Sequence, residues 1–197
     1  MILFSSDSAL KRWLPVSVLV LLMAVLQLIG PEVFRYENRL IEQGQLWRML
    51  CGHWVHANWI HYGLNVAGLL LCVALTQITW GSWQWAWRIL LLSLGISVAF
   101  LIFHPDISWY VGFSGVLFGL YVMSSLKVWS QQRLMSSLIL LFIVVKIGLE
   151  QWGGVQSTSS EWIRVPVLVD AHAYGVLIAL LIVALRRLWA QFSSGAD

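Results

Sequence analysis

The sequence predicts an all-α, polytopic membrane protein, a bundle of six transmembrane helices. Of its 197 residues, 59% are hydrophobic and only 11% are charged, whereas soluble domains carry about 25% charged residues. Apolar runs long enough to cross a bilayer recur along the chain. We therefore expect one membrane domain over residues 1–197, with no separate soluble domain and with a retained first anchor in place of a cleaved signal.

Short polar or Gly/Pro segments divide the apolar runs into spans. The first run ends at Gly30-Pro31, and the last closes at Arg186-Arg187. The fourth run is short, so its first residue should lie below the membrane surface. The expected spans are residues 13–29, 58–79, 86–103, 114–129, 134–149 and 165–185.

The segments between spans differ in character. Residues 31–56 mix charged with aromatic side chains, which indicates a structured segment lying at the interface. A polar stretch from Glu150 to Arg164 separates the last two spans. A turn rich in tryptophan follows the second span and fits an aromatic belt at a membrane surface. Its residues are Trp80, Trp83, Trp85, Trp87 and Arg88.

Charge favours one orientation and excludes some functions. Six spans put both termini on one side, and that side holds seven of the twelve Lys and Arg residues. The positive-inside rule then makes the termini cytoplasmic. The net charge of +3 is small and dispersed, which argues against nucleic-acid binding. Cys51 and Cys72 resemble neither a disulfide framework nor a zinc site.

The fourth span begins with Gly112-Phe113-Ser114-Gly115. The two glycines leave the Ser114 hydroxyl accessible. A helix start also offers free backbone N–H groups that can stabilise an anion. The same pattern occurs in ordinary turns and helix-packing sites, so it indicates a nucleophile only if other residues support it.

His61 and Asn65, four residues apart, share one face of the second span. Polar residues in a membrane span are costly unless they form bonds inside the bundle. Three interpretations stay open here. The pair can join helices by hydrogen bonds, hold a metal or haem, or donate to a developing oxyanion. No carboxylate or cysteine sits at ligand spacing, which weakens the second interpretation.

His172 lies near the outer end of the last span, at about the depth expected for Ser114. If the fourth and last spans pack closely, His172 can reach Ser114 and act as its base. The alternative is a core histidine bonded to a backbone carbonyl. Both spans carry pairs of small residues suited to close packing. The pairs are Gly115 with Gly119, and Gly175 with Ala179.

Together these stretches resemble the rhomboid intramembrane serine proteases over nearly the whole chain. The matching motifs are Trp47-Arg48, His56-x4-His61-x3-Asn65, Gly112-Phe113-Ser114-Gly115 and Ala171-His172-x-x-Gly175. The resemblance implies a dyad of Ser114 as nucleophile and His172 as base. It also implies an oxyanion hole of His61, Asn65 and the Ser114 N–H, with no metal or cofactor. Asp170, two residues before His172, is interpreted as a cap or loop contact.

The resemblance also implies transmembrane protein substrates within the bilayer, a bacterial inner-membrane location and an active site that opens to the periplasm. We expect a polar cavity capped by the loop before His172. Phe118 stands where many relatives carry a tyrosine that stacks on the histidine, and Ala179 replaces a second glycine. The small size is similar to the rhombosortase branch, which processes secreted proteins with a C-terminal Gly-Gly sequence, an apolar helix and a basic tail. The alternatives are an inactive rhomboid-like binder of membrane helices and a histidine-ligated metal or haem protein.

Overall fold

The computed structural model describes residues 6–152 and 158–194, and these residues form ten helices and no strand. Five helices are long and apolar enough to cross a membrane, and a sixth apolar helix, α7 (Ser114–Val128), is shorter. The five are α1 (Ser6–Ile29), α5 (Trp59–Thr76), α6 (Ser82–Phe103), α8 (Arg133–Trp152) and α10 (Asp170–Ser194). The predicted all-α, multi-pass architecture is confirmed.

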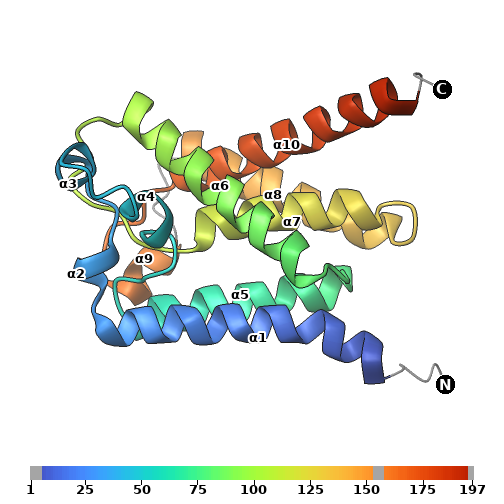
Figure 1. Cartoon of the computed structure of the whole chain (residues 1–197), viewed down its shortest axis with the longest axis horizontal. Coiled ribbons are helices and arrows are strands. Elements are labelled where there is room, and N and C mark those ends of the chain that lie inside the picture. The colour runs from blue at the N-terminus through green and yellow to red at the C-terminus, as the bar shows by residue number, and fades with distance from the viewer. Residues whose placement is uncertain (1–5, 153–157, 195–197) are drawn as a thin grey trace.

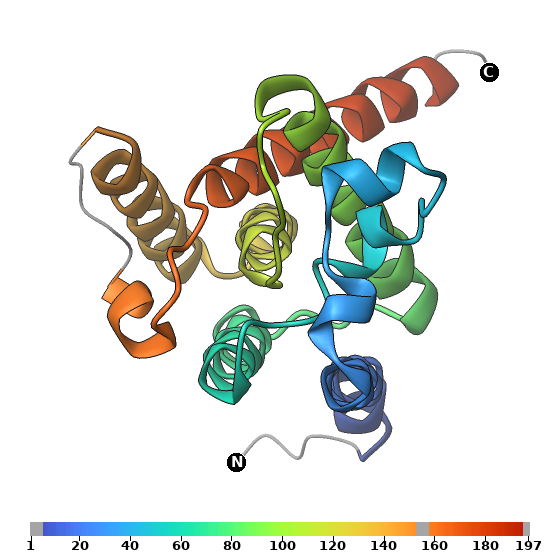
Figure 2. The ribbon, with the colours of Figure 1, turned by 90° about the vertical axis from the view of Figure 1, so that its left-hand side faces the viewer.

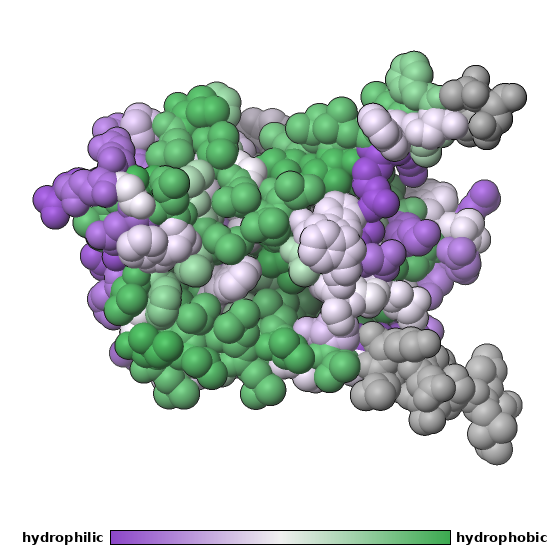
Figure 3. Space-filling model, in the orientation of Figure 1, coloured by the Kyte–Doolittle hydropathy of each residue, from purple (hydrophilic) through white to green (hydrophobic). Residues whose placement is uncertain are grey.

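Helix α7 lies in the middle of the bundle. Helices α1, α5 and α7 run lengthwise and α6 crosses the bundle obliquely (Figure 1), and the end-on view shows α5, α6, α8 and α10 around α7 (Figure 2). Val116 and Leu120 of α7 are fully buried. The visible surface carries a broad apolar band, with hydrophilic side chains gathered at its two ends (Figure 3). Ser114, the first residue of α7, is therefore placed within a ring of helices at one end of this band.

The third span begins earlier than expected. Helix α6 starts at Ser82 and not at residue 86, because the backbone N–H of Gly81 donates to Gln84 Oε1 at 3.1 Å and caps the first turn. Most of the tryptophans predicted to form a turn thus lie on α6. Trp85 is buried edge-on against Trp80, with ring centroids 5.0 Å apart, so these two rings pack in the protein core.

The last two spans also differ from their predicted bounds. Helix α10 starts at Asp170, not at residue 165. Pro166 disfavours helical conformation in Val165 before it, and residues 166–168 form an irregular loop. Helix α8 continues to Trp152, three residues beyond the expected end, and so takes Glu150 out of the predicted polar stretch. The middle of that stretch, residues 153–157, lies outside the described residues, and α9 (Thr158–Ile163) follows it.

The segment between α1 and α5 is structured, as predicted. It contains α2 (Pro31–Phe34), α3 (Asn38–Glu42) and α4 (Arg48–Cys51). The Arg48 guanidinium is buried and donates 2.8 Å hydrogen bonds to Gln45 Oε1 and to the Arg35 carbonyl. Tyr36 and Tyr110 exchange two backbone hydrogen bonds of 3.0 and 2.9 Å. This pairing fastens the loop before Ser114 to the interfacial segment.

Candidate active site

Gly112 sets the path of the chain into Ser114. Its φ of +128° is a conformation that residues with side chains rarely adopt. A Cβ atom there would lie 2.7 Å from His61 Cε1, so glycine is also required for space. The Tyr110 hydroxyl donates to the Gly112 carbonyl at 2.8 Å, and the Gly112 N–H donates to the Gly52 carbonyl at 3.2 Å. These contacts hold the Ser114 end of α7 in one geometry.

Small residues allow α7 and α10 to touch through their backbones, as predicted. A Cβ atom on Gly115 would lie 2.7 Å from the Ala171 carbonyl oxygen. One on Gly119 would lie 2.8 Å from the Gly175 carbonyl oxygen, and one on Gly175 would overlap the Gly115 carbonyl. Ala179 is fully buried. This approach is what brings the His172 side chain within reach of Ser114.

His172 Nε2 lies 2.9 Å from Ser114 Oγ, a hydrogen-bond distance. The histidine is only 3% exposed. The Phe118 ring lies over the imidazole with centroids 4.5 Å apart and planes 13° apart, which is the stacking predicted from the sequence. A serine hydroxyl bonded to a histidine held in a fixed plane is an arrangement suited to nucleophilic catalysis.

A carboxylate that the sequence analysis missed contacts the other side of this histidine. Glu150 Oε2 lies 2.8 Å from His172 Nδ1, and Lys146 Nζ lies 2.6 Å from Glu150 Oε1. The family resemblance implies a dyad with no acid. The sequence feature that points to Glu150 is the charged pair Lys146-x3-Glu150 at the end of an apolar span, because intramembrane ionisable residues commonly mark a functional site. Asp170, in contrast, lies near His104, with 3.6 Å between Oδ2 and Nε2, and is a loop contact as interpreted.

Comparison with known protein families shows which family the chain belongs to. The model of the Rhomboid domain matches residues 43–188, a range that contains Ser114, His172 and Glu150. The chain belongs to the rhomboid family. Comparisons with curated proteins and with solved structures give no match. Rhomboid proteins are generally intramembrane serine proteases that act on transmembrane substrates, although some members are inactive.

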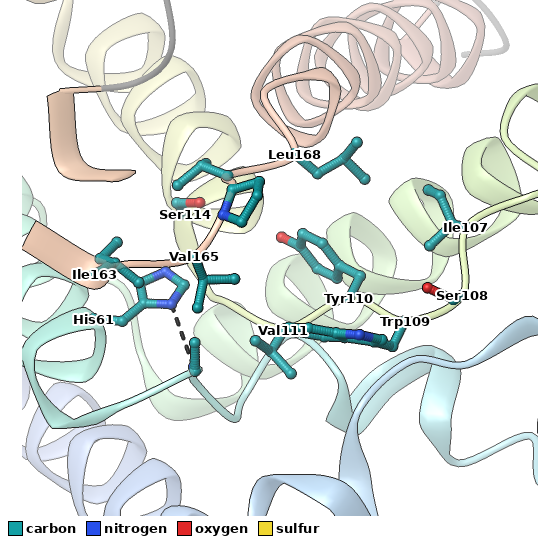
Figure 4. Close-up of a pocket in the computed structure, with 13 residues that line it drawn as sticks. His61, Ile107, Ser108, Trp109, Tyr110, Val111, Ser114, Ile163, Val165 and Leu168 are labelled. Carbon is teal, nitrogen blue, oxygen red and sulfur yellow. Dashed lines mark hydrogen bonds between the residues drawn. The ribbon is translucent and has the colours of Figure 1, made fainter. Parts of the chain in front are cut away.

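His61 of this rhomboid domain faces the same cavity as Ser114 (Figure 4). Asn58 caps α5 by accepting the His61 N–H at 2.9 Å, which fixes the start of that helix. The Ala57 N–H donates a long, 3.5 Å hydrogen bond to His61 Nδ1. In the neutral ring the proton is then on Nε2, where it can be donated to a ligand.

Asn65 is buried one turn along α5. Its Nδ2 donates to the His61 carbonyl at 3.0 Å, a bond within the helix. Unlike His61, Asn65 does not line the cavity that contains Ser114. Its amide has a second hydrogen to donate, so the bond to His61 does not use up its capacity.

The remaining predicted residues of the rhomboid motifs act at a distance from Ser114. His56 is fully buried and packs edge-on against His61, with centroids 5.1 Å apart. Gln27 bonds to both the backbone N–H and the carbonyl of His56. Burial lowers the pKa of His56 from 6.5 to about 3, so the ring is neutral. Trp47 is half exposed and Arg48 bonds within its own segment, and neither lines the cavity that contains Ser114.

A cavity of about 280 Å³ opens beside Ser114. The loop before α10, residues 165–168, lines one side of it, as expected, together with Ile163 at the end of α9, and the loop before α7 lines the other (Figure 4). Its wall is less polar than the sequence suggested. The lining residues are Ala57, His61, Ile107, Ser108, Trp109, Tyr110, Val111, Ser114, Ile163, Val165, Pro166, Val167 and Leu168. Such a site suits an extended peptide with apolar side chains.

Proposed function

We propose that this rhomboid protein is an intramembrane serine endopeptidase in which Ser114 is the nucleophile and His172 the general base. The observation that carries the proposal is the 2.9 Å contact between Ser114 Oγ and His172 Nε2. It occurs at the rim of a cavity and inside a domain of a protease family. A serine becomes nucleophilic only when a base can remove its proton, and this contact supplies the base.

The positions of these groups support the following reaction. A substrate helix unwinds near the membrane surface, helped by small or helix-breaking residues, and offers an extended segment to the cavity. Ser114 Oγ attacks the scissile carbonyl while its proton passes to His172 Nε2. The imidazolium then protonates the leaving amine, and water hydrolyses the acyl-enzyme with His172 again as base.

The oxyanion of the tetrahedral intermediate needs hydrogen-bond donors. Three candidates are the Ser114 backbone N–H at the start of α7, the His61 ring in the same cavity, and the Asn65 amide one turn further along α5. The α7 N–H groups have no partner within the first turn of the helix and lie at the positive end of its dipole. Donors fixed in a site of low polarity stabilise a developing charge strongly. We assign the first two a direct role and Asn65 a role that needs a turn of its amide.

The most direct test uses the Ser114→Ala and His172→Ala variants. Each should abolish cleavage of a co-expressed membrane-anchored reporter, while thermal melting in detergent shows a folded protein. A fluorophosphonate probe should label the wild type but neither variant, because the probe reports an activated serine. Retained cleavage by either folded variant would exclude this mechanism. Absence of labelling in the wild type would instead favour an inactive binder of membrane helices.

We further propose that the termini are cytoplasmic, that the cavity opens to the periplasm across a bacterial inner membrane, and that the substrates are of the rhombosortase kind. A reporter fused after Asp197 should then behave as cytoplasmic, and one inserted at residues 153–157 as periplasmic. The reverse pattern would contradict this orientation.

A reporter with a Gly-Gly segment, an apolar helix and a basic tail should be cleaved in preference to one whose Gly-Gly is replaced by Leu-Leu.

A metal or haem site has less support. Across residues 6–152 and 158–194, no group of three or more His, Cys, Asp or Glu side chains is arranged to hold a metal ion. Two of the histidines bind other side chains: His53 Nε2 lies 3.0 Å from Ser97 Oγ, and His172 is bonded through both ring nitrogens. An optical spectrum of the purified protein tests this alternative directly.

A further inference from the structure

We infer that Glu150 is a positioning residue for His172, so that this rhomboid site operates as a Ser114–His172–Glu150 triad rather than as a dyad. The inference rests on the proposed function, because it assigns Glu150 a role in the same proton transfer. The three residues come from three helices, α7, α10 and α8, which meet at one end of the bundle.

The geometry fixes which nitrogen of His172 carries the proton. Glu150 Oε2 lies 2.8 Å from Nδ1, and Ser114 Oγ lies 2.9 Å from Nε2. An ionised carboxylate can only accept hydrogen bonds, so Nδ1 of the neutral ring is the donor and Nε2 is left with its lone pair toward Ser114. This is the tautomer that a general base requires. Without Glu150, nothing in this contact pattern selects it.

Lys146 pairs with the second oxygen of Glu150 and so favours the ionised carboxylate in a fixed orientation. Lys146 Nζ, one turn earlier on α8, lies 2.6 Å from Oε1. The Glu150 side chain is 3% exposed and the Lys146 side chain 29%. A carboxylate this buried is costly unless each oxygen is paired, and here both are. The arrangement leaves one oxygen for Lys146 and one for His172, so the lysine does not compete for the oxygen that contacts the ring.

Glu150 also acts during the reaction. When His172 accepts the Ser114 proton, the imidazolium lies between the serine and a carboxylate whose charge is already in place. Such a fixed charge stabilises the ion pair that forms in the transition state, and it needs no reorganisation at that moment. Phe118 holds the plane of the ring, and Glu150 holds its rotation within that plane. The two contacts together leave the imidazole one productive orientation.

A simpler role is that Glu150 only ties α8 to α10 by an ion contact. The two roles differ in what a substitution changes. A tie affects folding stability and leaves the chemistry of the folded site alone. A positioning residue affects the rate of Ser114 modification in protein that is fully folded. The test therefore has to separate the rate at saturation from probe binding and from stability.

The experiment measures how fast a fluorophosphonate probe modifies Ser114 in the purified full-length protein, over a range of probe concentrations. Glu150→Gln keeps the shape and removes the charge. Its maximal labelling rate should fall by about 10²–10⁴-fold, the range for losing general-base catalysis or the correct tautomer. The probe concentration for half-maximal rate should stay near the wild-type value. Glu150→Asp, which keeps the charge, should recover part of the rate, and the exposed Glu42→Gln is the matched control.

Each outcome separates the possibilities. A folded Glu150→Gln protein that labels at the wild-type rate overturns the triad, and so does a variant that only loses thermal stability. If Glu150→Gln does not fold, Lys146→Gln/Glu150→Gln removes both charges and leaves none unpaired; slow labelling of this folded double variant upholds the triad, and wild-type labelling refutes it. His172→Ala distinguishes the two proposals. Normal labelling of His172→Ala defeats the Ser–His mechanism itself, whereas loss in His172→Ala alone defeats only the role of Glu150.

Discussion

The contact between α7 and α10 makes Gly115→Ala a sharp test of how the site is assembled. The added Cβ would lie 2.7 Å from the Ala171 carbonyl oxygen and 3.1 Å from the carbonyl carbon, whereas ordinary contacts begin at 3.4 Å. Both neighbours are backbone atoms, which cannot rotate away. The helices must therefore separate by several tenths of an ångström. Ser114 adjoins Gly115 and His172 adjoins Ala171, so the 2.9 Å hydrogen bond between Ser114 and His172 must lengthen.

The size of the effect follows from two opposing terms. Overpacking a tight contact costs about 1–3 kcal/mol of folding free energy. Alanine in place of glycine inside a helix raises the folding stability by about 1 kcal/mol. We therefore expect a modest loss of stability but a large loss of activity, since a misplacement approaching 1 Å can cost about 10²-fold in rate. Gly175→Ala should be worse, because its Cβ would overlap the Gly115 carbonyl.

The assay compares thermal melting in detergent with the fluorophosphonate labelling rate for Gly115→Ala and for Gly63→Ala. Gly63 lies on α5 with nothing within 4 Å of its added Cβ, so it reports the helix-propensity gain alone. Gly63→Ala should melt at or above the wild-type temperature and label normally. If Gly115→Ala matched Gly63→Ala in both measurements, the backbone contact would not control the distance between Ser114 and His172.

Two further predictions concern donors and buried histidines. Asn65→Ala should lower kcat on the Gly-Gly reporter by about 10²–10³-fold with KM near wild type, because an oxyanion donor acts mainly in the transition state; an unchanged kcat with reduced stability would make Asn65 a helix contact only. Burial lowers the pKa of His53 and His56 from 6.5 to about 3, so the unfolded chain takes up protons that the folded protein excludes. Stability should thus be complete above pH 6.5 and fall as the pH drops toward 3, by up to about 1.4 kcal/mol per pH unit for each ring. His53→Gln should make this slope shallower, and a flat melting temperature between pH 6 and 4 would contradict the lowered pKa values of His53 and His56.

Much of the fold could be predicted from the sequence because its signals are local. Apolar runs fix the spans, and the predicted fourth span differs from α7 by one residue. The pairing of α7 with α10 was also predictable, since small residues four apart recur on both. The errors occur at helix ends. Residues 165–169 are apolar and look like membrane span, yet Pro166 and the contacts of the loop with the cavity keep them out of α10.

The candidate site was predictable in part for the same reason. Ser114 and His172 each stand beside residues with an unusual local pattern, glycines in one case and a short polar motif in the other. Glu150 has no such neighbourhood. A glutamate at the end of an apolar run reads equally well as a solvated residue at the membrane surface. Only the packing of α8 against α10 shows that the Glu150 carboxylate faces inward. It contacts His172 Nδ1, which is 22 residues later in the sequence.

The placement of the site on separate helices has a consequence for how its parts can fail. Helices α8 and α10 are each long and apolar enough to cross a membrane, but Ser114, His172 and Glu150 meet only after α7, α8 and α10 pack. Gly115 controls the distance between Ser114 and His172, whereas Glu150 controls which nitrogen of His172 faces the serine. Gly115→Ala should therefore slow labelling while the tautomer stays correct, and Glu150→Gln should slow it while the helices stay in place. Measured in one protein with one probe, the two variants separate distance from protonation as the origin of reactivity at Ser114.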